Sequence, residues 1–278
     1  MALELLAANE VHAMSREFRI LLVGAMDTEL AGLRKHVSSA PDRPVHAVFP
    51  YERAHVAGLE LGIVQTHVGD INATMATSEA IRRFNPDHVF KLGCVGGHAE
   101  GIHTGDIVVP IGFFHSGAWL TRAKADNTAT TDATQWQSLF GEQPYQINAS
   151  NLGGRAHVLS SDLALTKALV ACLQDQRLSY IPAYVGSSTM WFFDRAFMSH
   201  VLTAQVPHAT TKAWVADMES YAIAQACSVY NKPFTGLYRV SNSDYYNEPY
   251  RPDAVAGLFE QPVLNILTAF LHRLATQR

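Results

Sequence analysis

The stretch PDHVFKLGCVGG, residues 86 to 97, begins with a turn signal, continues as an apolar run of strand length and ends in glycines. Proline and aspartate mark the start of such a strand, and closely spaced glycines mark the turn after it. The same order occurs earlier in FRILLVGAM, residues 18 to 26, where the helical pattern DTELAGLRKHV follows directly. This repetition predicts a chain in which strands alternate with helices.

The alternation continues to the end of the chain. We expect helices at residues 70–84, with Asp70 as N-cap, at 162–174, capped by Asp162, at 194–202, at 216–227 and from about 253, and strands at 105–114, 181–188 and 233–241. This order predicts an α/β fold, a three-layer α/β/α sandwich with a central mixed β-sheet. We expect residues 1–17 to form an N-terminal extension and residues 18–278 a single domain, with a long polar loop or insertion at 124–154.

The composition excludes several classes of protein. The 278 residues are 48% hydrophobic and 17% charged, which is ordinary for a globular chain with a large core. A net charge of -4 gives no basic surface, so we expect neither nucleic acid nor a membrane as partner. The three cysteines form no C-x-x-C pair, and the N-terminus lacks a secretory pattern. Free thiols and no leader predict a cytoplasmic protein.

Common catalytic motifs are absent from the chain. No G-x-x-x-x-G-K-[ST], G-x-G-x-x-G, G-x-S-x-G or H-E-x-x-H sequence occurs, which argues against the usual nucleotide-phosphate, serine-hydrolase and zinc-protease chemistries. The thirteen histidines are scattered. His98 and His103 are close together but no third ligand is indicated, so we interpret them as solvated loop side chains and predict no metal site.

Ligands of α/β sheets bind where strands end. We therefore expect functional residues in five places, at 24–29, 93–97, 187–194, 217–219 and 241–244. The segment 217–219 lies in ADMESYAIAQAC, residues 216 to 227, whose apolar spacing predicts a buried helical face. Glu219 falls on this face, which raises the question of what its carboxylate binds. A carboxylate on a buried face needs a partner.

Four segments together resemble the methylthioadenosine/S-adenosylhomocysteine nucleosidases, within the wider purine nucleoside phosphorylase-like superfamily. They are ILLVGAMDTEL, NPDHVFKLGCVGGHAEGIHTGDIVVP, ADMESYAIAQACSVYNKPF and the less similar RVSNSD. The resemblance implies a nucleoside phosphorylase-like fold and hydrolysis of the N-glycosidic bond of a purine nucleoside, which releases adenine and a thioribose product. It implies no cofactor. It also implies a homodimer whose neighbouring subunit helps to line the substrate pocket, with residues 113–115 as the expected segment.

The resemblance assigns roles to the acidic residues. Glu29 matches the glutamate that activates water, although an isolated acid in a first helical turn would be read as a partner of the helix dipole. Glu219 matches the glutamate that accepts hydrogen bonds from the ribose 2′- and 3′-hydroxyls, with a capping role as the alternative. Met218 would pack against the sugar. We expect Asp217, also placed at the substrate site, to hold backbone amides of neighbouring loops.

Other residues of the matched segments would line the site. Met26 belongs to the corner before Glu29, and Gly93 allows the backbone to approach a ligand closely. Cys94 stands where the family commonly has serine, and no neighbouring base indicates that it is a nucleophile. Trp191 and Phe192 align with the segment that sandwiches the purine, and the alternative is that they are plain core residues.

The leaving-group position departs from the family. Counting from Pro233 without a gap, the aspartate that protonates the base falls on Asn242, whose amide can donate a hydrogen bond but cannot supply an acidic proton. Asp244 would take over if the loop bulges by one or two residues. Two other functions therefore stay open, namely action on another purine nucleoside, such as a 6-oxopurine, by hydrolysis or phosphorolysis, and nucleoside binding without catalysis. The early loop carries Asp27 and Glu29, which repel phosphate and favour hydrolysis.

Overall fold

The computed structural model describes residues 18–37, 40–41, 48–56, 58–121, 130–143, 145–251 and 261–276. The predicted N-terminal extension, residues 1–17, lies outside the described residues, as do parts of the predicted insertion at 124–154. The division into an extension and one domain therefore stays a prediction.

Ten strands of the described chain form one mixed sheet in the order β11-β10-β6-β12-β5-β1-β4-β3-β2, with β9 beside β6. Their bounds are β1 Phe18–Gly24, β2 Ala40–Pro41, β3 Tyr51–Val56, β4 Leu59–Gln65, β5 His88–Gly97, β6 Ile107–His115, β9 Leu159–Ser160, β10 Ile181–Ser187, β11 Trp214–Asp217 and β12 Phe234–Ser243. The central neighbours β4, β1, β5 and β12 are parallel. At the far end β11 also pairs with the end of β5, so the sheet curls back on itself.

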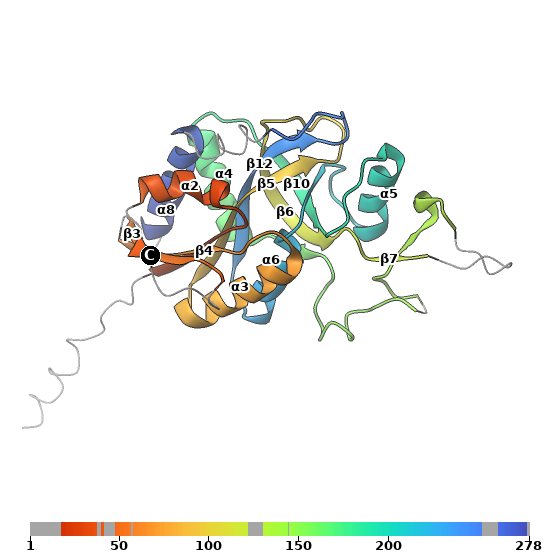
Figure 1. Ribbon diagram of the computed structural model, residues 1–278, viewed down its shortest axis with the longest axis horizontal. Helices are drawn as coiled ribbons and strands as arrows, with labels where there is room; N and C mark the ends of the chain where they lie inside the picture. The colour runs from red at the N-terminus through yellow and green to blue at the C-terminus, as the bar shows by residue number, and fades with distance from the viewer. Residues whose placement is uncertain are drawn as a thin grey trace, which may run out of the picture.

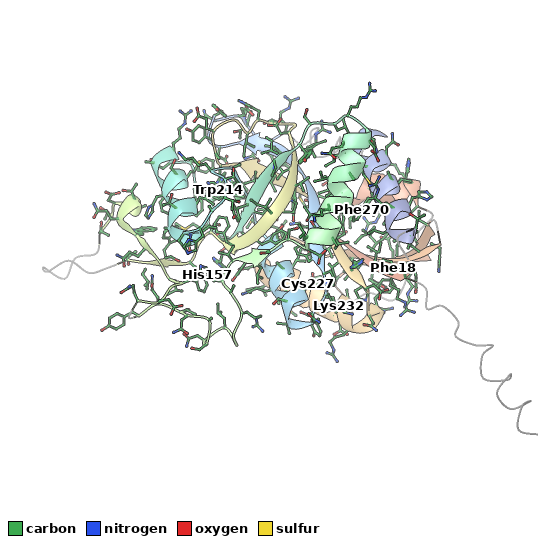
Figure 2. The ribbon with its side chains drawn as sticks, turned by 180° about the vertical axis from the view of Figure 1, so that it is seen from behind. Phe18, His157, Trp214, Cys227, Lys232 and Phe270 are labelled. Atoms are coloured by element: carbon green, nitrogen blue, oxygen red, sulfur yellow. The ribbon has the colours of Figure 1, made fainter. Side chains whose placement is uncertain are left out.

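Helices cover both faces of this sheet (Figure 1). One face carries α2 (Asp27–His36), α4 (Leu163–Asp175) and α8 (Gln261–Thr276), and the other carries α3 (Asp70–Phe84), α5 (Arg195–Gln205) and α6 (Ser220–Val229). Alternate residues of β1 divide between two cores, with Ile20 and Leu22 in one and Leu21 and Val23 in the other. Figure 2 shows one member of each core, Phe270 on α8 and Trp214 on β11. The predicted three-layer α/β/α architecture with a mixed sheet is confirmed.

The short described elements between β6 and α4 extend the molecule on one side, next to α5 (Figure 1). They are β7 Trp119–Leu120, the 3₁₀ helix η1 Ala133–Gln135 and β8 Gln137–Ser138. His200 of α5 contacts the carbonyl of Trp136 there at 2.7 Å. Apart from β9 and an isolated bridge between Phe140 and Ile147, the rest of this described segment is turns and irregular chain, as its polar composition predicts.

Local signals predicted most helix starts. Asp162 is the N-cap of α4 and accepts a hydrogen bond from the Leu165 amide at 2.9 Å, as expected. Asp70 is not an N-cap, because Gly69 occupies that position with φ 104° and Asp70 is the first helical residue. The helix predicted from residue 216 begins only at Ser220, because Trp214–Asp217 form the short strand β11.

A β-bulge interrupts β12 where it approaches the expected site. Val240 pairs with Val95 of β5 and Asn242 pairs with Gly96, so Ser241 is the extra residue. Because side chains alternate along a strand, one extra residue reverses the face to which all following side chains point. The bulge brings both Asn242 and Asp244 to the cavity described next.

Candidate active site

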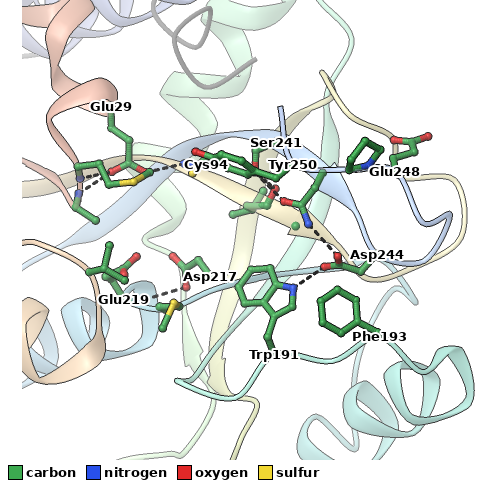
Figure 3. Close-up of a pocket in the computed structure, with 18 of the residues that line it drawn as sticks. Glu29, Cys94, Trp191, Phe193, Asp217, Glu219, Ser241, Asp244, Glu248 and Tyr250 are labelled. Atoms are coloured by element: carbon green, nitrogen blue, oxygen red, sulfur yellow. Dashed lines mark hydrogen bonds between the residues drawn. The ribbon is translucent and has the colours of Figure 1, made fainter. Parts of the chain in front are cut away.

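A cavity of about 510 Å³ lies where β1, β5, β11 and β12 end. Its wall combines residues from the β1–α2 corner, the end of β5, the loop after β10, the β11–α6 turn and the end of β12. Figure 3 shows Glu29 and Glu219 toward one end of this cavity and Trp191, Phe193 and Asp244 toward the other. The five segments predicted from strand ends therefore meet in one place.

Glu29 is buried, and three backbone amides donate to its carboxylate. Oε2 accepts hydrogen bonds from the amides of Ala25 at 2.6 Å and Met26 at 3.0 Å, and Oε1 accepts one from the amide of Cys94 at 2.9 Å. A carboxylate oxygen has two acceptor positions, so Oε1 keeps one that is not used by these bonds. The first-turn capping contact with Met26 exists, but the bond from β5 shows that capping is not its whole role.

Glu219 occupies the N-cap position of α6 but makes no side-chain cap bond. Its Oε1 accepts from the amide of Gly69 at 2.9 Å, and its Oε2 accepts from Nζ of Lys91 at 3.1 Å. The alternative reading of Glu219 as a cap partner is therefore wrong. Each oxygen keeps one free acceptor position, which is what two adjacent hydroxyls of a ligand require.

Lys91 lies inside the protein beneath Glu29 and Glu219, with no solvent exposure. Its ammonium donates to Oδ2 of Asp217 at 2.5 Å and to Glu219, and it lies 5.7 Å from the Tyr238 ring centre. Gly93 makes room for it, since a Cβ at Gly93 would lie 2.9 Å from Cε of Lys91 and 3.5 Å from Oε1 of Glu29. A buried ammonium in contact with two carboxylates is a balanced arrangement that a single substitution would break.

Asp217 lies in the cavity wall, but its oxygens are already occupied by other groups. They accept from Lys91, from the hydroxyls of Ser187 and Ser220, and from the amides of Glu219 and Ser220. Asp217 therefore holds the β11–α6 turn through the amides of that turn, whereas the sequence led us to expect the amides of neighbouring loops.

The cluster has opposite effects on the pKa values of its two acids. Burial raises the pKa of Glu219, and the attraction of Lys91 only partly offsets this. Burial also acts to raise the pKa of Asp217, but Lys91 and the serine hydroxyls outweigh it and hold that pKa below its usual range. Burial alone would lower the pKa of Lys91, yet the surrounding acids raise it well above the usual value.

Cys94 is half-buried between these acids. Burial, with the neighbouring charge of Glu29, raises the pKa of its thiol. A thiol with a raised pKa is a poor nucleophile, because the thiolate is the reactive form. This agrees with the expectation that Cys94 is not a nucleophile, and its backbone amide donates to Glu29.

Asn242 and Asp244 both line the other end of the cavity. Nδ2 of Asn242 donates to Oδ1 of Asp244 at 3.0 Å, and Oδ1 of Asn242 accepts from the hydroxyl of Ser241 at 2.9 Å. Oδ2 of Asp244 accepts from Nε1 of Trp191 at 2.9 Å and lies 2.8 Å from Nε2 of His98. The sequence left open which of the two residues faces a ligand, and both line the cavity.

The other residues expected in the wall line the cavity with two exceptions, Gly93 and Phe192. Met26, Met218 and Trp191 line the cavity, whereas Gly93 lies beneath it. Phe192 is buried with its ring 5.0 Å from that of Phe197, so it belongs to the core. The exposed neighbour Phe193 takes the place expected for Phe192.

Two important residues were missed or misread. The sequence could have indicated the role of Lys91, because it is a charged residue inside the apolar run HVFKLG. A lysine buried in this way is almost always paired with an acid. His98 was interpreted as a solvated loop residue, which is wrong, since it is 1% exposed and bound to Asp244. Of these two histidines, His103 is the solvated one, and its ring stacks on Tyr246.

The part of the chain that the structure describes contains no group of three or more His, Cys, Asp or Glu side chains arranged to hold a metal ion. None of the described helices combines the length and apolar character needed to cross a membrane.

A family model described as the phosphorylase superfamily matches residues 19–271. The chain belongs to the phosphorylase superfamily. One curated relative, the 5′-methylthioadenosine/S-adenosylhomocysteine nucleosidase of Anoxybacillus flavithermus, is 24% identical over 223 residues, which cover 80% of this chain and 84% of the relative. The resemblance inferred from four segments is confirmed.

Solved structures of other proteins share the fold. A Campylobacter jejuni 5′-methylthioadenosine/S-adenosyl homocysteine nucleosidase is similar with a TM-score of 0.72 at 16% identity, over 92% of this chain and 99% of that chain. The native futalosine hydrolase of Helicobacter pylori strain 26695 gives a TM-score of 0.69 at 15% identity with the same coverage of 92% and 99%. At these identities the similarity establishes the architecture alone.

Proposed function

We propose that the protein is a purine nucleoside N-glycosidic hydrolase, with methylthioadenosine or S-adenosylhomocysteine as substrate and adenine and a thioribose compound as products. The observation that carries this proposal is the pair of buried glutamates at one end of the cavity, each with a free acceptor position, facing an aromatic and amide-lined other end. The names of the curated relatives support the substrate class.

The acidic end suits the sugar of such a substrate. As the bond from C1′ to N9 breaks, its electron pair leaves with the base and positive charge builds on the ribose. Glu29 would take a proton from the attacking water at its Oε1, and the departing base anion would take up one proton from solvent, so that one water is consumed in all. Glu219 would accept hydrogen bonds from the two ribose hydroxyls. This end of the cavity holds three carboxylates, Glu29, Asp217 and Glu219, and one ammonium, Lys91. The resulting negative field stabilises a cationic transition state.

The same field supports water rather than phosphate as the attacking group. No arginine or lysine is among the described residues that line the cavity, and Lys91 beneath it is already bound by two carboxylates. Arg82 and Arg83, late in α3, are engaged elsewhere, with Arg82 near Glu79 and Arg83 over the Tyr51 ring. A phosphate dianion would have to approach Glu29 and Glu219 without a cation to receive it.

A second candidate function is hydrolysis of a 6-oxopurine nucleoside. It is favoured by one observation, the asparagine at position 242 where the nucleosidases have an aspartate. The similarity in fold to a futalosine hydrolase is compatible with it. A catalytically inactive nucleoside-binding protein is the third possibility, and the same assay distinguishes it.

The proposal includes a homodimer. On α3 and just before it, Val68, Ile71 and Met75 form an apolar face that is 46%, 73% and 48% exposed. Val68 also lines the cavity, so a subunit docked on this face would reach the mouth of the site. The segment first expected to reach a neighbour, residues 113–115, fits less well, because Phe113 and Phe114 are buried in their own core.

We also propose a cytoplasmic location and a single domain over residues 18–278. The three cysteines of the chain are free thiols, which supports a reducing compartment. Both cores run through the same central sheet, which supports one domain.

The test is to incubate the purified protein separately with methylthioadenosine, S-adenosylhomocysteine and inosine and to separate the released bases by chromatography. We expect adenine from the first two substrates and little hypoxanthine from inosine. Hypoxanthine as the main product would select the 6-oxopurine alternative. Release of no base from any of the three would contradict the proposed activity.

A further inference from the structure

The ammonium of Lys91 joins two acids that lie at the end of β11 and at the start of α6. Nζ donates to Oδ2 of Asp217 at 2.5 Å and to Oε2 of Glu219 at 3.1 Å. Both acids line the cavity (Figure 3), whereas Lys91 lies beneath them and does not line it. Any effect of Lys91 on a ligand is therefore transmitted by the acids that it contacts.

The interior is shaped around this ammonium. A Cβ at Gly93 would lie 2.9 Å from Cε of Lys91, and a Cβ at Gly236 would lie 2.7 Å from the ring of Tyr238. Because both positions lack a side chain, the Tyr238 ring centre lies 5.7 Å from Nζ, within the range of a cation–π contact. The ring and the two carboxylates replace the water that the ammonium loses on burial.

Lys91 also fixes one of the two oxygens of Glu219. Oε2 faces the ammonium, and Oε1 accepts from the amide of Gly69 at 2.9 Å. The two donors lie on different elements, β5 and the turn before α3, so together they determine the plane of the carboxylate. Each carboxylate oxygen has two acceptor positions, so one on each oxygen remains for a ligand.

The groups around Glu219 have opposite effects on its ionisation. Burial raises its pKa, and the negative charges of Asp217 on β11 and Glu29 on α2 act in the same direction. The charge of Lys91 and the hydrogen bond from Gly69 act in the other direction. The ammonium is thus the positive charge that favours the ionised carboxylate over the protonated one.

The other titratable groups at this cluster are neutral at physiological pH. Burial raises the pKa of Cys94 on β5 and of Tyr238 on β12, so both keep their protons. Burial acts to lower the pKa of Lys91, but the surrounding acids raise it well above the usual value. A base with a raised pKa keeps its proton to higher pH, so Lys91 stays charged in neutral and mildly alkaline solution.

We propose that Lys91 is the positioning residue for sugar recognition, because its ammonium keeps Glu219 ionised and oriented to accept from two adjacent ribose hydroxyls. A protonated Glu219 would present a donor where one hydroxyl needs an acceptor. The site would then lose much of its preference for a ribose over a sugar that lacks one hydroxyl. This inference rests on the proposed function for the ligand class alone.

Carbon-13 NMR of protein labelled at the glutamate side-chain carboxyl tests the first step without a ligand. The signal of Glu219 is assigned by its loss in Glu219→Gln. We expect it to titrate about 1–3 pH units higher in Lys91→Met than in the wild type, the range for loss of an adjacent opposite charge. Lys232→Met, the same change at a lysine that bonds Asn85 outside the cavity, should leave this titration unchanged.

Calorimetric binding of nucleosides that cannot be hydrolysed tests the second step. The probes are formycin A, whose ribose is joined to the base by a C–C bond, and 2′-deoxyformycin A, which lacks one hydroxyl. We expect the wild type to prefer formycin A about ten- to a hundredfold at both pH 7 and pH 9, the range for one hydrogen bond to a charged group. Lys91→Met should lose about tenfold of this preference at pH 7. It should regain that preference at pH 9, where Glu219 ionises without the ammonium.

The outcomes distinguish this inference from the proposed function. A wild type that prefers formycin A but cleaves no nucleoside would sustain the inference and refute the hydrolase. Equal binding of the two probes, or binding of neither, would overturn the inference even in an active hydrolase.

The recovery with pH separates a role in recognition from simple packing. A lysine that only fills the interior gives a loss that does not return at pH 9, and this result would overturn the inference, as would an unchanged titration of Glu219 in Lys91→Met. If Lys91→Met does not fold, the wild type decides. A constant preference between pH 7 and pH 9 would sustain the inference, and a preference that grows more than about tenfold would show that Glu219 is protonated at pH 7 despite the ammonium.

Discussion

Lys91 is the residue on which the acidic end of the site depends. It contacts two carboxylates at 2.5 and 3.1 Å and has no exposed surface, so its removal would leave Asp217 and Glu219 facing one another without a counter-ion. We predict that Lys91→Met lowers the free energy of unfolding by about 3–5 kcal/mol, the cost of breaking a buried pair. Urea unfolding followed by circular dichroism would measure this change.

The matched control is Lys232→Met, which carries the same substitution at a residue whose ammonium bonds the exposed side-chain oxygen of Asn85 at 2.9 Å. It should cost no more than about 1 kcal/mol. Equal losses in the two variants would show that burial of the charge at Lys91 does not matter.

The thiol of Cys94 gives a prediction about pH. Burial raises its pKa, and an acid with a raised pKa stays protonated to higher pH, so the reactive thiolate is withheld at pH 8. Burial has the same effect on the pKa values of Cys172 and Cys227. We predict that Ellman's reagent labels the native protein very slowly at pH 8 and labels all three cysteines in urea. Rapid labelling of native Cys94 would contradict the environment described for it.

At the scale of elements, the N-termini of α3 and α6 meet through one hydrogen bond. The amide of Gly69 donates to Glu219, and Gly69 has φ 104° and ψ 151°, a conformation that is open essentially to glycine alone. We predict that Gly69→Ala costs about 1–3 kcal/mol of stability and raises the KM for the nucleoside, because it displaces Glu219, the glutamate proposed to bind the ribose. Unfolding in urea and steady-state kinetics would give both values.

Gly58 provides the control for this change. It also has a positive φ, 79°, and open space around it, but it lies in the turn between β3 and β4, away from the site residues. Gly58→Ala should lose stability without a change in KM. A raised KM in both variants would mean that the effect is not specific to the α3–α6 contact.

The elements also show what the sequence could and could not predict. Periodicity and turn residues predicted both β5 and α4, because apolar spacing and an aspartate N-cap are local signals. The strand β11 was missed, because Trp214–Asp217 has only four residues and is stabilised by neighbours far away in sequence. The helix start at Ser220 was misplaced for the same reason, since the apolar pattern continues through the strand.

The site residues also divide into those with a local signal in the sequence and those fixed by contacts distant in sequence. Glu29 and Glu219 were predicted because the resemblance places them in ordered segments. The sequence named a bulge only as the condition under which Asp244 would replace Asn242. The bulge itself, at Ser241, depends on the register between β12 and β5, which the sequence does not give. The contact between His98 and Asp244 joins residues that are 146 positions apart, and the sequence near either residue does not predict the other as its partner.

For the whole molecule, the apolar face on α3 predicts association. We expect the protein to be a dimer by light scattering and Met75→Glu to shift it toward monomer, because a charge buried at an interface is costly. The control is Leu163→Glu, a residue that is 65% exposed on α4, on the other face of the sheet. A wild-type monomer, or a dimer that Met75→Glu leaves intact, would contradict the proposed interface.

The central claim is that water, activated by Glu29, cleaves a purine nucleoside at the acidic end of the cavity. The most direct measurement quantifies adenine and the sugar product from methylthioadenosine in phosphate-free buffer, with wild type and Glu29→Gln in parallel. We predict equal amounts of adenine and unphosphorylated sugar from the wild type, and a rate about 10²- to 10⁴-fold lower in Glu29→Gln with ligand binding retained. Release of base only when phosphate is added, or undiminished turnover in Glu29→Gln, would contradict the account.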